Sequence, residues 1–200
     1  MYISHILFPV KVLGPGNRIG IWMAGCIHHC KGCSNPELWE QNPKYKTDLK
    51  TVMDLIEMIA NKYTVDGFTI TGGDPFYQQD ALRALMQAIH PISSDILVYT
   101  GYQYEDLPKD IVSRAAVIID GKYHESKNNG EMLRGSSNQR IFIKEEFQTL
   151  YEDYLKQGES KIQNFTTKDG IISVGIHLPG FEQKLKSAAK ERGLEEVTDG

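Results

Sequence analysis

The chain has 200 residues, of which 40% are hydrophobic and 24% are charged, so its composition is that of a globular protein with an apolar core. No apolar run approaches the roughly 18 residues that cross a bilayer, which excludes a membrane-spanning helix. The net charge of −4 gives no basic surface for nucleic acid. A secretory signal is not expected, because Pro9 interrupts the apolar N-terminal stretch.

Short apolar runs predict five strands, at residues 19–24, 67–71, 95–100, 116–120 and 139–143. Apolar residues at helical spacing predict helices between these strands, at residues 47–63, 82–89 and 107–114. Thr47 is the expected N-cap of the first helix. Continuously apolar strands that alternate with helices indicate a parallel sheet buried on both faces.

These β/α units fill about 140 residues, whereas a complete barrel needs roughly 250. The sequence therefore predicts an α/β fold with a partial, open TIM-type β/α barrel over residues 1–143. Within it, the polar segment 122–137 is expected to be a mobile loop.

Residues 144–200 are expected to form a short α+β C-terminal extension. Its predicted elements are a helix at 145–157, a hairpin with strands 161–167 and 171–176 around Lys168-Asp169-Gly170, and a helix at 181–192 ended by Gly193.

All three cysteines, Cys26, Cys30 and Cys33, lie within eight consecutive residues after the first predicted strand. An odd, clustered number without an export signal indicates a metal site and not a disulfide framework. A zinc ion would need a fourth ligand, which His28 or His29 offers. An iron–sulfur cube normally takes four thiolates, so three would leave one iron open to a non-protein ligand.

The segment 72–75, Gly-Gly-Asp-Pro, follows the second predicted strand. Two glycines let the backbone approach a ligand closely, although an ordinary tight turn has the same sequence. In parallel β/α folds the chemistry lies at the carboxyl ends of the strands. The cysteine loop, this glycine-rich segment and residues 99–102 and 120–122 all fall at such ends, so we expect them to form one site.

Six motifs occur in order along the chain: Gly-Pro-Gly-Asn-Arg at 14–18, Cys-x3-Cys-x2-Cys at 26–33, Gly-Gly-Asp-Pro at 72–75, Tyr-Thr-Gly-Tyr at 99–102, Asp-Gly-Lys at 120–122 and Gly-Ser-Ser-Asn-Gln-Arg at 135–140. The cysteine spacing and the glycine-rich segment are similar to those of the radical S-adenosylmethionine (SAM) superfamily. The whole set, with Gly32 before the last cysteine, resembles the activating proteins of anaerobic ribonucleotide reductase, a family of glycyl-radical-enzyme activases, over residues 5–143.

The resemblance implies a cytoplasmic, oxygen-sensitive radical SAM enzyme with the partial barrel of that superfamily. Cys26, Cys30 and Cys33 would hold a [4Fe–4S] cluster whose open iron binds SAM. An electron from a flavodoxin- or ferredoxin-type donor would cleave SAM to methionine and a 5′-deoxyadenosyl radical, which takes a hydrogen atom from a glycine of a partner glycyl radical enzyme. The cofactor supplies the difficult step, so no catalytic side chain is assigned and no nucleic acid or membrane partner is expected.

The resemblance also marks candidate SAM-binding residues: Gly72, Gly73, Asp74, Pro75, Thr100, Asp120, Ser136 and Asn138. A capping role explains Asp120 equally well. Arg18 and Arg140 are candidate partners for carboxylates of SAM or of the partner enzyme. His28 and His29 are interpreted as variable positions over the cluster, and His177 as a structural histidine.

Two alternatives stay open. One is a radical SAM enzyme on an activase-like scaffold that modifies a small molecule or peptide. The extension, which has no further cysteine, would then close over the substrate pocket. The other is a zinc-stabilised binding module without catalysis, which predicts a colourless protein.

Overall fold

The structure is a computed structural model that describes residues 1–167 and 170–192. Its centre is a six-stranded sheet in which the strands follow chain order from β1 to β6. The strands are β1 (Ile3–Val10), β2 (Arg18–Met23), β3 (Gly67–Gly72), β4 (Ile96–Tyr99), β5 (Val117–Asp120) and β6 (Arg140–Ile143). The fold is therefore mixed α/β.

The four central strands, β2 to β5, are parallel, as the sequence predicted. The two edge strands, β1 and β6, are antiparallel to their neighbours, so the sheet is only mostly parallel. β1 is missing from the predicted strands because Pro9 interrupts it and most of its residues are half-buried instead of alternating.

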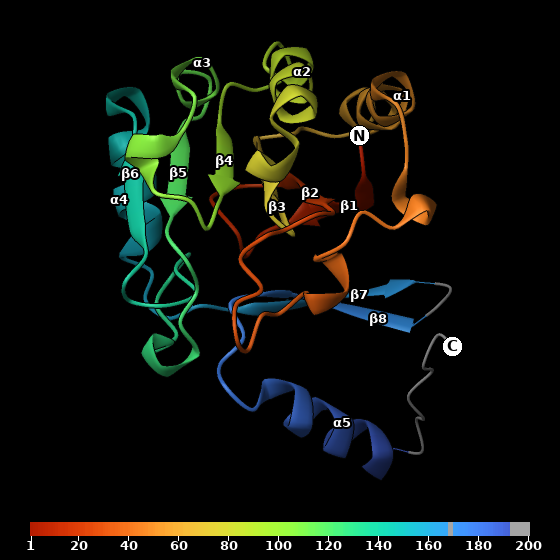
Figure 1. Cartoon of the computed structure of the whole chain (residues 1–200), viewed down its shortest axis with the longest axis vertical. Helices are drawn as coiled ribbons and strands as arrows, with labels where there is room; N and C mark the ends of the chain where they lie inside the picture. The colour runs from red at the N-terminus through yellow and green to blue at the C-terminus, as the bar shows by residue number, and fades with distance from the viewer. Residues whose placement is uncertain (168–169, 193–200) are drawn as a thin grey trace.

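Three helices cover one face of this sheet: α1 (Leu49–Ala60), α2 (Gln79–Ile89) and α3 (Lys109–Val112) (Figure 1). Alternate strand residues, among them Ile21, Ile70 and Val98, form the main core with this helical layer. α1 begins after Asp48, whose carboxylate accepts a hydrogen bond from Thr51 N at 2.8 Å. The N-cap is therefore Asp48 and not Thr47 as predicted.

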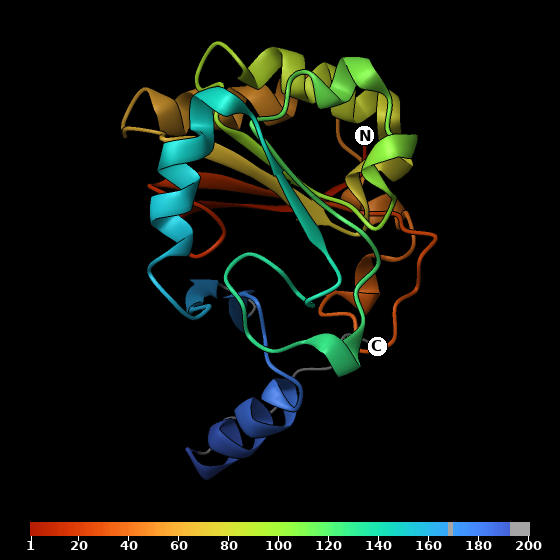
Figure 2. The same cartoon turned by 90° about the vertical axis from the view of Figure 1, so that its left-hand side faces the viewer.

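The chain that follows β6 covers the opposite face, as Figure 2 shows for α4 (Gln148–Leu155). Tyr151 and Tyr154 of this helix are buried in a cluster with Leu97 of β4 and Val117 of β5. The segment 122–137 packs here too, because its Met132 and Leu133 belong to the same cluster. Apolar burial and hydrogen bonds therefore attach part of this segment to the sheet.

A hairpin of β7 (Ile162–Thr167) and β8 (Gly170–Gly175) lies beside β1 and β2. Its Val174 is buried in a cluster with Trp22 of β2. α5 (Phe181–Glu191) projects away from the sheet below the hairpin (Figure 1). The predicted turn residues Lys168 and Asp169, and the predicted helix end at Gly193, lie outside the described residues.

Arg18 connects the amino-terminal ends of three central strands. Its side chain is fully buried, donates to both carboxylate oxygens of Asp95, at 2.7 and 3.1 Å, and also donates to the Phe68 carbonyl at 2.6 Å. The hydroxyl of Tyr151 donates to the same carboxylate at 2.6 Å. The Arg18 guanidinium therefore binds buried groups of this chain. This corrects the expectation that it pairs with a carboxylate of SAM or of a partner.

Within the described part of the chain, none of the helices has the length and apolar character needed to cross a membrane.

Candidate functional site

One pocket lies at the carboxyl ends of the four parallel strands. The loops after β2, β3, β4 and β5 all contribute to its lining, with residues that include Cys26, Gly72, Thr100 and Gly121. The predicted convergence of these loops is therefore present. The pocket has a further wall, because β8 lines it as well.

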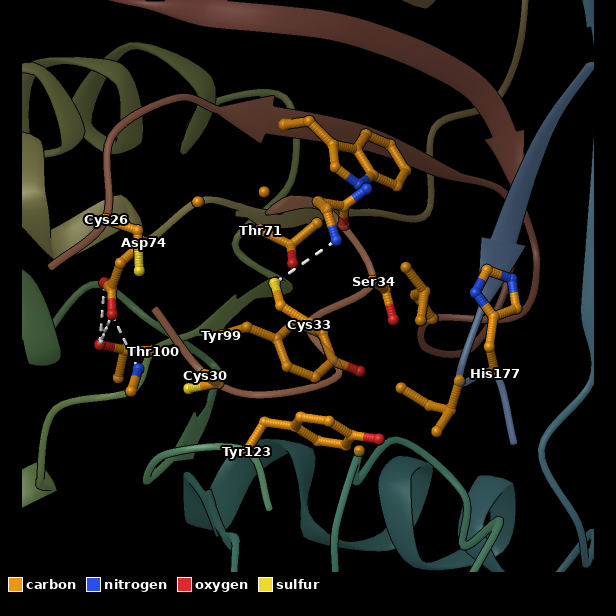
Figure 3. A pocket seen from close by; sticks show the side chains of 18 of the residues that line it. Cys26, Cys30, Cys33, Ser34, Thr71, Asp74, Tyr99, Thr100, Tyr123 and His177 are labelled. Atoms are coloured by element: carbon orange, nitrogen blue, oxygen red, sulfur yellow. Dashed lines mark hydrogen bonds between the residues drawn. The ribbon is translucent and has the colours of Figure 1, made fainter. Parts of the chain in front are cut away.

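All three thiols line this pocket, and none of them forms a disulfide (Figure 3). The backbone N–H groups of His28 and Asn35 each donate to a cysteine sulfur, Cys26 Sγ and Cys33 Sγ, at 3.4 Å. Burial raises the pKa of the three thiols above the ordinary value, so they carry protons until a metal displaces them.

Three free thiolate donors in one loop fit an iron–sulfur cube with one iron left open. Among the described residues, no three His, Cys, Asp or Glu side chains converge closely enough to hold a single metal ion. A cube does not require such convergence, since each thiolate binds a different iron.

Backbone hydrogen bonds join the cysteine loop to the glycine-rich segment. Gly73 N donates to the Met23 carbonyl at 2.7 Å, and Asp74 N donates to the Gly25 carbonyl at 2.8 Å. A Cβ on Gly72, whose φ is +111°, would lie 2.3 Å from the Met23 oxygen, and one on Gly73 would lie 2.6 Å from the Gly25 oxygen. Both glycines are thus explained by the close approach of the two loops, whatever else they contact.

Asp74 is buried, and its carboxylate is surrounded by protein groups. It accepts hydrogen bonds from Thr100 Oγ1 at 3.0 Å, from Gly101 N at 2.8 Å and from Phe76 N at 2.9 Å. His28 Nε2 lies 2.9 Å from Oδ2, the carboxylate oxygen that also accepts from Gly101 N. Asp74 therefore connects the cysteine loop to the end of β4.

His28 is a functional candidate that sequence reasoning missed. From the sequence His28 was given no role, but its side chain is only 6% exposed and contacts Asp74 and the Tyr102 ring. A Cβ on Gly101 would lie 2.4 Å from His28 Cδ2, so the glycine makes room for the imidazole. No local sequence pattern predicts the contact between His28 and Asp74, because the two residues are 46 positions apart.

The other candidates lie near the pocket but not in its lining. Asp120 is fully buried, accepts from Tyr104 N at 2.7 Å and forms an ion pair with Arg140. Ser136 Oγ accepts from His124 N at 3.1 Å, and Asn138 Nδ2 donates to the Lys122 carbonyl at 2.8 Å.

Neighbouring residues of the same loops reach the pocket instead: Gly121, Tyr123, Gly135 and Gln139. Pro75 is buried and begins a short 3₁₀ helix, Pro75–Gln78, outside the lining. Arg140 also pairs with Glu105, so its two carboxylate partners belong to this chain.

The buried polar atoms of the lining that have no hydrogen-bond partner in the described part of the chain include His5 Nε2, Tyr99 Oη and His177 Nε2. Burial lowers the pKa of His5 to about 4 and also lowers that of His177, so both imidazoles are neutral near pH 7. Figure 3 shows His177 on the other side of the view from Cys26 and Cys30, with Tyr99 and Cys33 in the middle. Unpaired buried polar atoms are rare in proteins, and their gathering at one pocket is typical of a binding site.

Comparison with known proteins agrees with this geometry. The family model described as "4Fe-4S single cluster domain" matches residues 12–142. Proteins named anaerobic ribonucleoside-triphosphate reductase-activating protein are similar to the chain. The protein of Enterobacteria phage T4 is 36% identical over 137 residues, which are 66% of this chain and 86% of that protein. That of Salmonella typhi is 33% identical over 150 residues, 68% of this chain and 96% of the relative, and that of Escherichia coli K12 is 32% identical over 148 residues, with the same coverage.

These relatives are matched over nearly their whole length, yet they account for only about two thirds of this chain. The family model ends at residue 142, before α4 and the hairpin begin. On its family match and its relatives, the chain belongs to the iron–sulfur activating proteins of anaerobic ribonucleoside-triphosphate reductase.

Proposed function

We propose that the protein is a radical SAM activase that generates a glycyl radical on an anaerobic ribonucleotide reductase. The observation that carries the proposal is the placement of three free thiols in a pocket at the carboxyl ends of four parallel strands. The names of the relatives support the choice of partner. In this proposal the sheet is the partial β/α barrel of radical SAM enzymes, formed by residues 1–143, and residues 144–200 are an extension to it.

Cys26, Cys30 and Cys33 would hold a [4Fe–4S] cluster, and Gly72, Gly73 and Thr100 line the space where SAM would lie beside it. The cluster would pass one electron from a flavodoxin- or ferredoxin-type donor to SAM, and so would supply the reductive C–S cleavage to methionine and the hydrogen-abstracting 5′-deoxyadenosyl group that the partner's glycine requires.

The chain's own contribution is orientation. Asp74 fixes the cysteine loop against β4 through His28, Thr100 and Gly101, so the thiols and the SAM site keep one geometry. Asp120, Ser136 and Asn138 support the lining indirectly, by holding the loops that carry Gly121 and Gly135. β8 of the hairpin lines the same pocket as the cysteines and would in this way shield part of the site from solvent.

The test is electron paramagnetic resonance on an anaerobic mixture of reconstituted protein, SAM, a strong reductant and the anaerobic ribonucleotide reductase of the same organism. We expect a glycyl-radical doublet on the reductase and production of 5′-deoxyadenosine in the same tube. Cys30→Ala should abolish both signals. Lys31→Ala, in the same loop with a 93% exposed side chain, is the matched control and should retain activity within about twofold.

One observation favours a second candidate, an enzyme that modifies a small molecule or peptide. β8 lines the pocket beside the thiols, as a closed substrate chamber would require. That candidate predicts 5′-deoxyadenosine without a glycyl doublet when the reductase is present. Formation of the doublet would eliminate it as the main activity.

A further inference from the structure

β8 has one strand edge that is not used by the fold. It pairs antiparallel with β7, and the two strands form a separate sheet. β7 is in turn fixed to the end of β1, because the Gln163 side chain donates to the Pro9 carbonyl at 2.7 Å and accepts from Lys11 N at 2.9 Å. In the described part of the chain, the other edge of β8 therefore presents unpaired backbone N–H and C=O groups.

This edge borders the pocket that contains the thiols. Every residue from 172 to 177 lines that pocket, without interruption. Side chains alternate between the two faces of a strand, so a cavity over one face would contact only every second residue. An unbroken run indicates that the cavity lies along the strand edge, where the backbone itself is within reach.

Side chains near this edge lack partners too. His177 Nε2, just after the end of β8, and Tyr99 Oη are both buried in the lining without a hydrogen-bond partner among the described residues. The ring of His177 stacks on Phe181 with centroids 4.3 Å apart, and its carbonyl accepts from Asn128 Nδ2 at 2.7 Å. The imidazole is thus held in place while its Nε2 is left for a ligand.

Glycine sets a specific recognition problem for an enzyme that must select it. It has no side chain to bind, so an activase must hold the backbone on both sides of the target residue. A free strand edge does this, since it binds an extended peptide through main-chain hydrogen bonds irrespective of side chains. The edge of β8 and the thiols border the same pocket, as such a substrate requires.

We propose that the free edge of β8 binds the glycine-bearing segment of the partner reductase as an added antiparallel or parallel strand. In this arrangement His177 Nε2 forms a hydrogen bond with the backbone of the bound segment. The inference rests on the proposed function and names the part of the extension that recognises the substrate. The family match ends before β8, so this docking edge is an addition of the present chain to the common domain.

The first test leaves the protein unchanged. The probe is a twelve-residue peptide centred on the radical-bearing glycine of the reductase, together with variants that carry one N-methyl group each. A strand on an edge uses every second amide for pairing. We therefore expect methylation to weaken binding to the reconstituted enzyme about tenfold at alternate positions and less than twofold at the positions between them.

Amide hydrogen exchange provides a second readout. Adding the unmethylated peptide should slow exchange in residues 171–176 and leave α1 unchanged. A flat methylation series, absence of peptide binding, or no added protection of β8 would each overturn the docking proposal.

A protein variant tests the role of His177. His177→Phe keeps an aromatic ring against Phe181 but removes Nε2, so the KM for the peptide should rise about five- to tenfold while kcat is retained. His90→Phe, an exposed histidine at the end of α2, is the matched control and should leave KM unchanged. An unaltered KM in His177→Phe would contradict the assignment of that residue.

The two proposals fail in different ways. If the wild-type enzyme forms no glycyl radical on the intact reductase, the proposed function is wrong, and the proposal that β8 binds the glycine-bearing segment is wrong as well. If the radical forms but the methylation series is flat, only the docking edge is wrong.

Discussion

At the level of single residues, Arg18 and Asp95 form a buried ion pair. Replacing Arg18 with Leu would leave a buried carboxylate with Tyr151 as its main remaining side-chain partner. We expect Arg18→Leu to lower the free energy of unfolding by about 3–5 kcal/mol, since an unpaired buried charge is strongly unfavourable. Urea denaturation of the cluster-free protein measures this. Asp54→Ala breaks the exposed Lys50–Asp54 pair and should cost less than about 1 kcal/mol; similar losses in both variants would refute the argument.

His5 gives the fold a dependence on pH. Burial lowers its pKa from the ordinary 6.5 to about 4, so between these values the unfolded chain binds a proton that the folded chain does not. Stability therefore decreases as the pH falls from 6.5 to 4, by about 3 kcal/mol in all from this residue. His5→Phe should preserve the stacking on Trp22 and remove this slope. The difference in unfolding free energy between the two cluster-free proteins should thus change across that interval, and a constant difference would contradict the prediction.

The hairpin is the element whose attachment can be tested separately. Val174 is 2% exposed and packs with Trp22, so a carboxylate at this position would be buried without a partner. We expect Val174→Asp to detach β7 and β8 from β2, which should accelerate proteolytic cleavage at residues 156–161 while the six-stranded sheet stays folded. Ile171→Asp, on the same strand but 59% exposed, should be cleaved like wild type. Unchanged cleavage of Val174→Asp would show that Val174 does not anchor the hairpin.

Elements with a local sequence pattern were predictable, and contacts between distant elements were not. The four parallel strands and α1 to α3 have apolar periodicity that identifies them without a structure. The hairpin was also predicted, but its packing against Trp22 was not, because Val174 of the hairpin and Trp22 lie about 150 positions apart in the sequence. The same distinction applies to the site. The spacing of three cysteines in one loop predicts a shared metal site, whereas the contact between His28 and Asp74 depends on the folding of two distant segments against each other.

At the scale of the whole molecule, we expect the order of the site, but not that of the sheet, to depend on the cluster. The amino-terminal ends of β2 to β4 are fixed by Arg18 and Asp95. The glycine-rich segment donates backbone hydrogen bonds to Met23 and Gly25, just before the loop of residues 26–33, and the loop itself contacts Asp74 through His28. Removal of iron from the reconstituted protein by a chelator should therefore lower the melting temperature and speed amide exchange at residues 26–39 and 72–74, because metal binding is coupled to the order of its ligands. Exchange in β2 to β4 should be unchanged. Cys30→Ala, treated in the same way, should show no response to the chelator. Equal acceleration throughout the sheet would mean that the cluster supports the whole fold, and would contradict a division between scaffold and site.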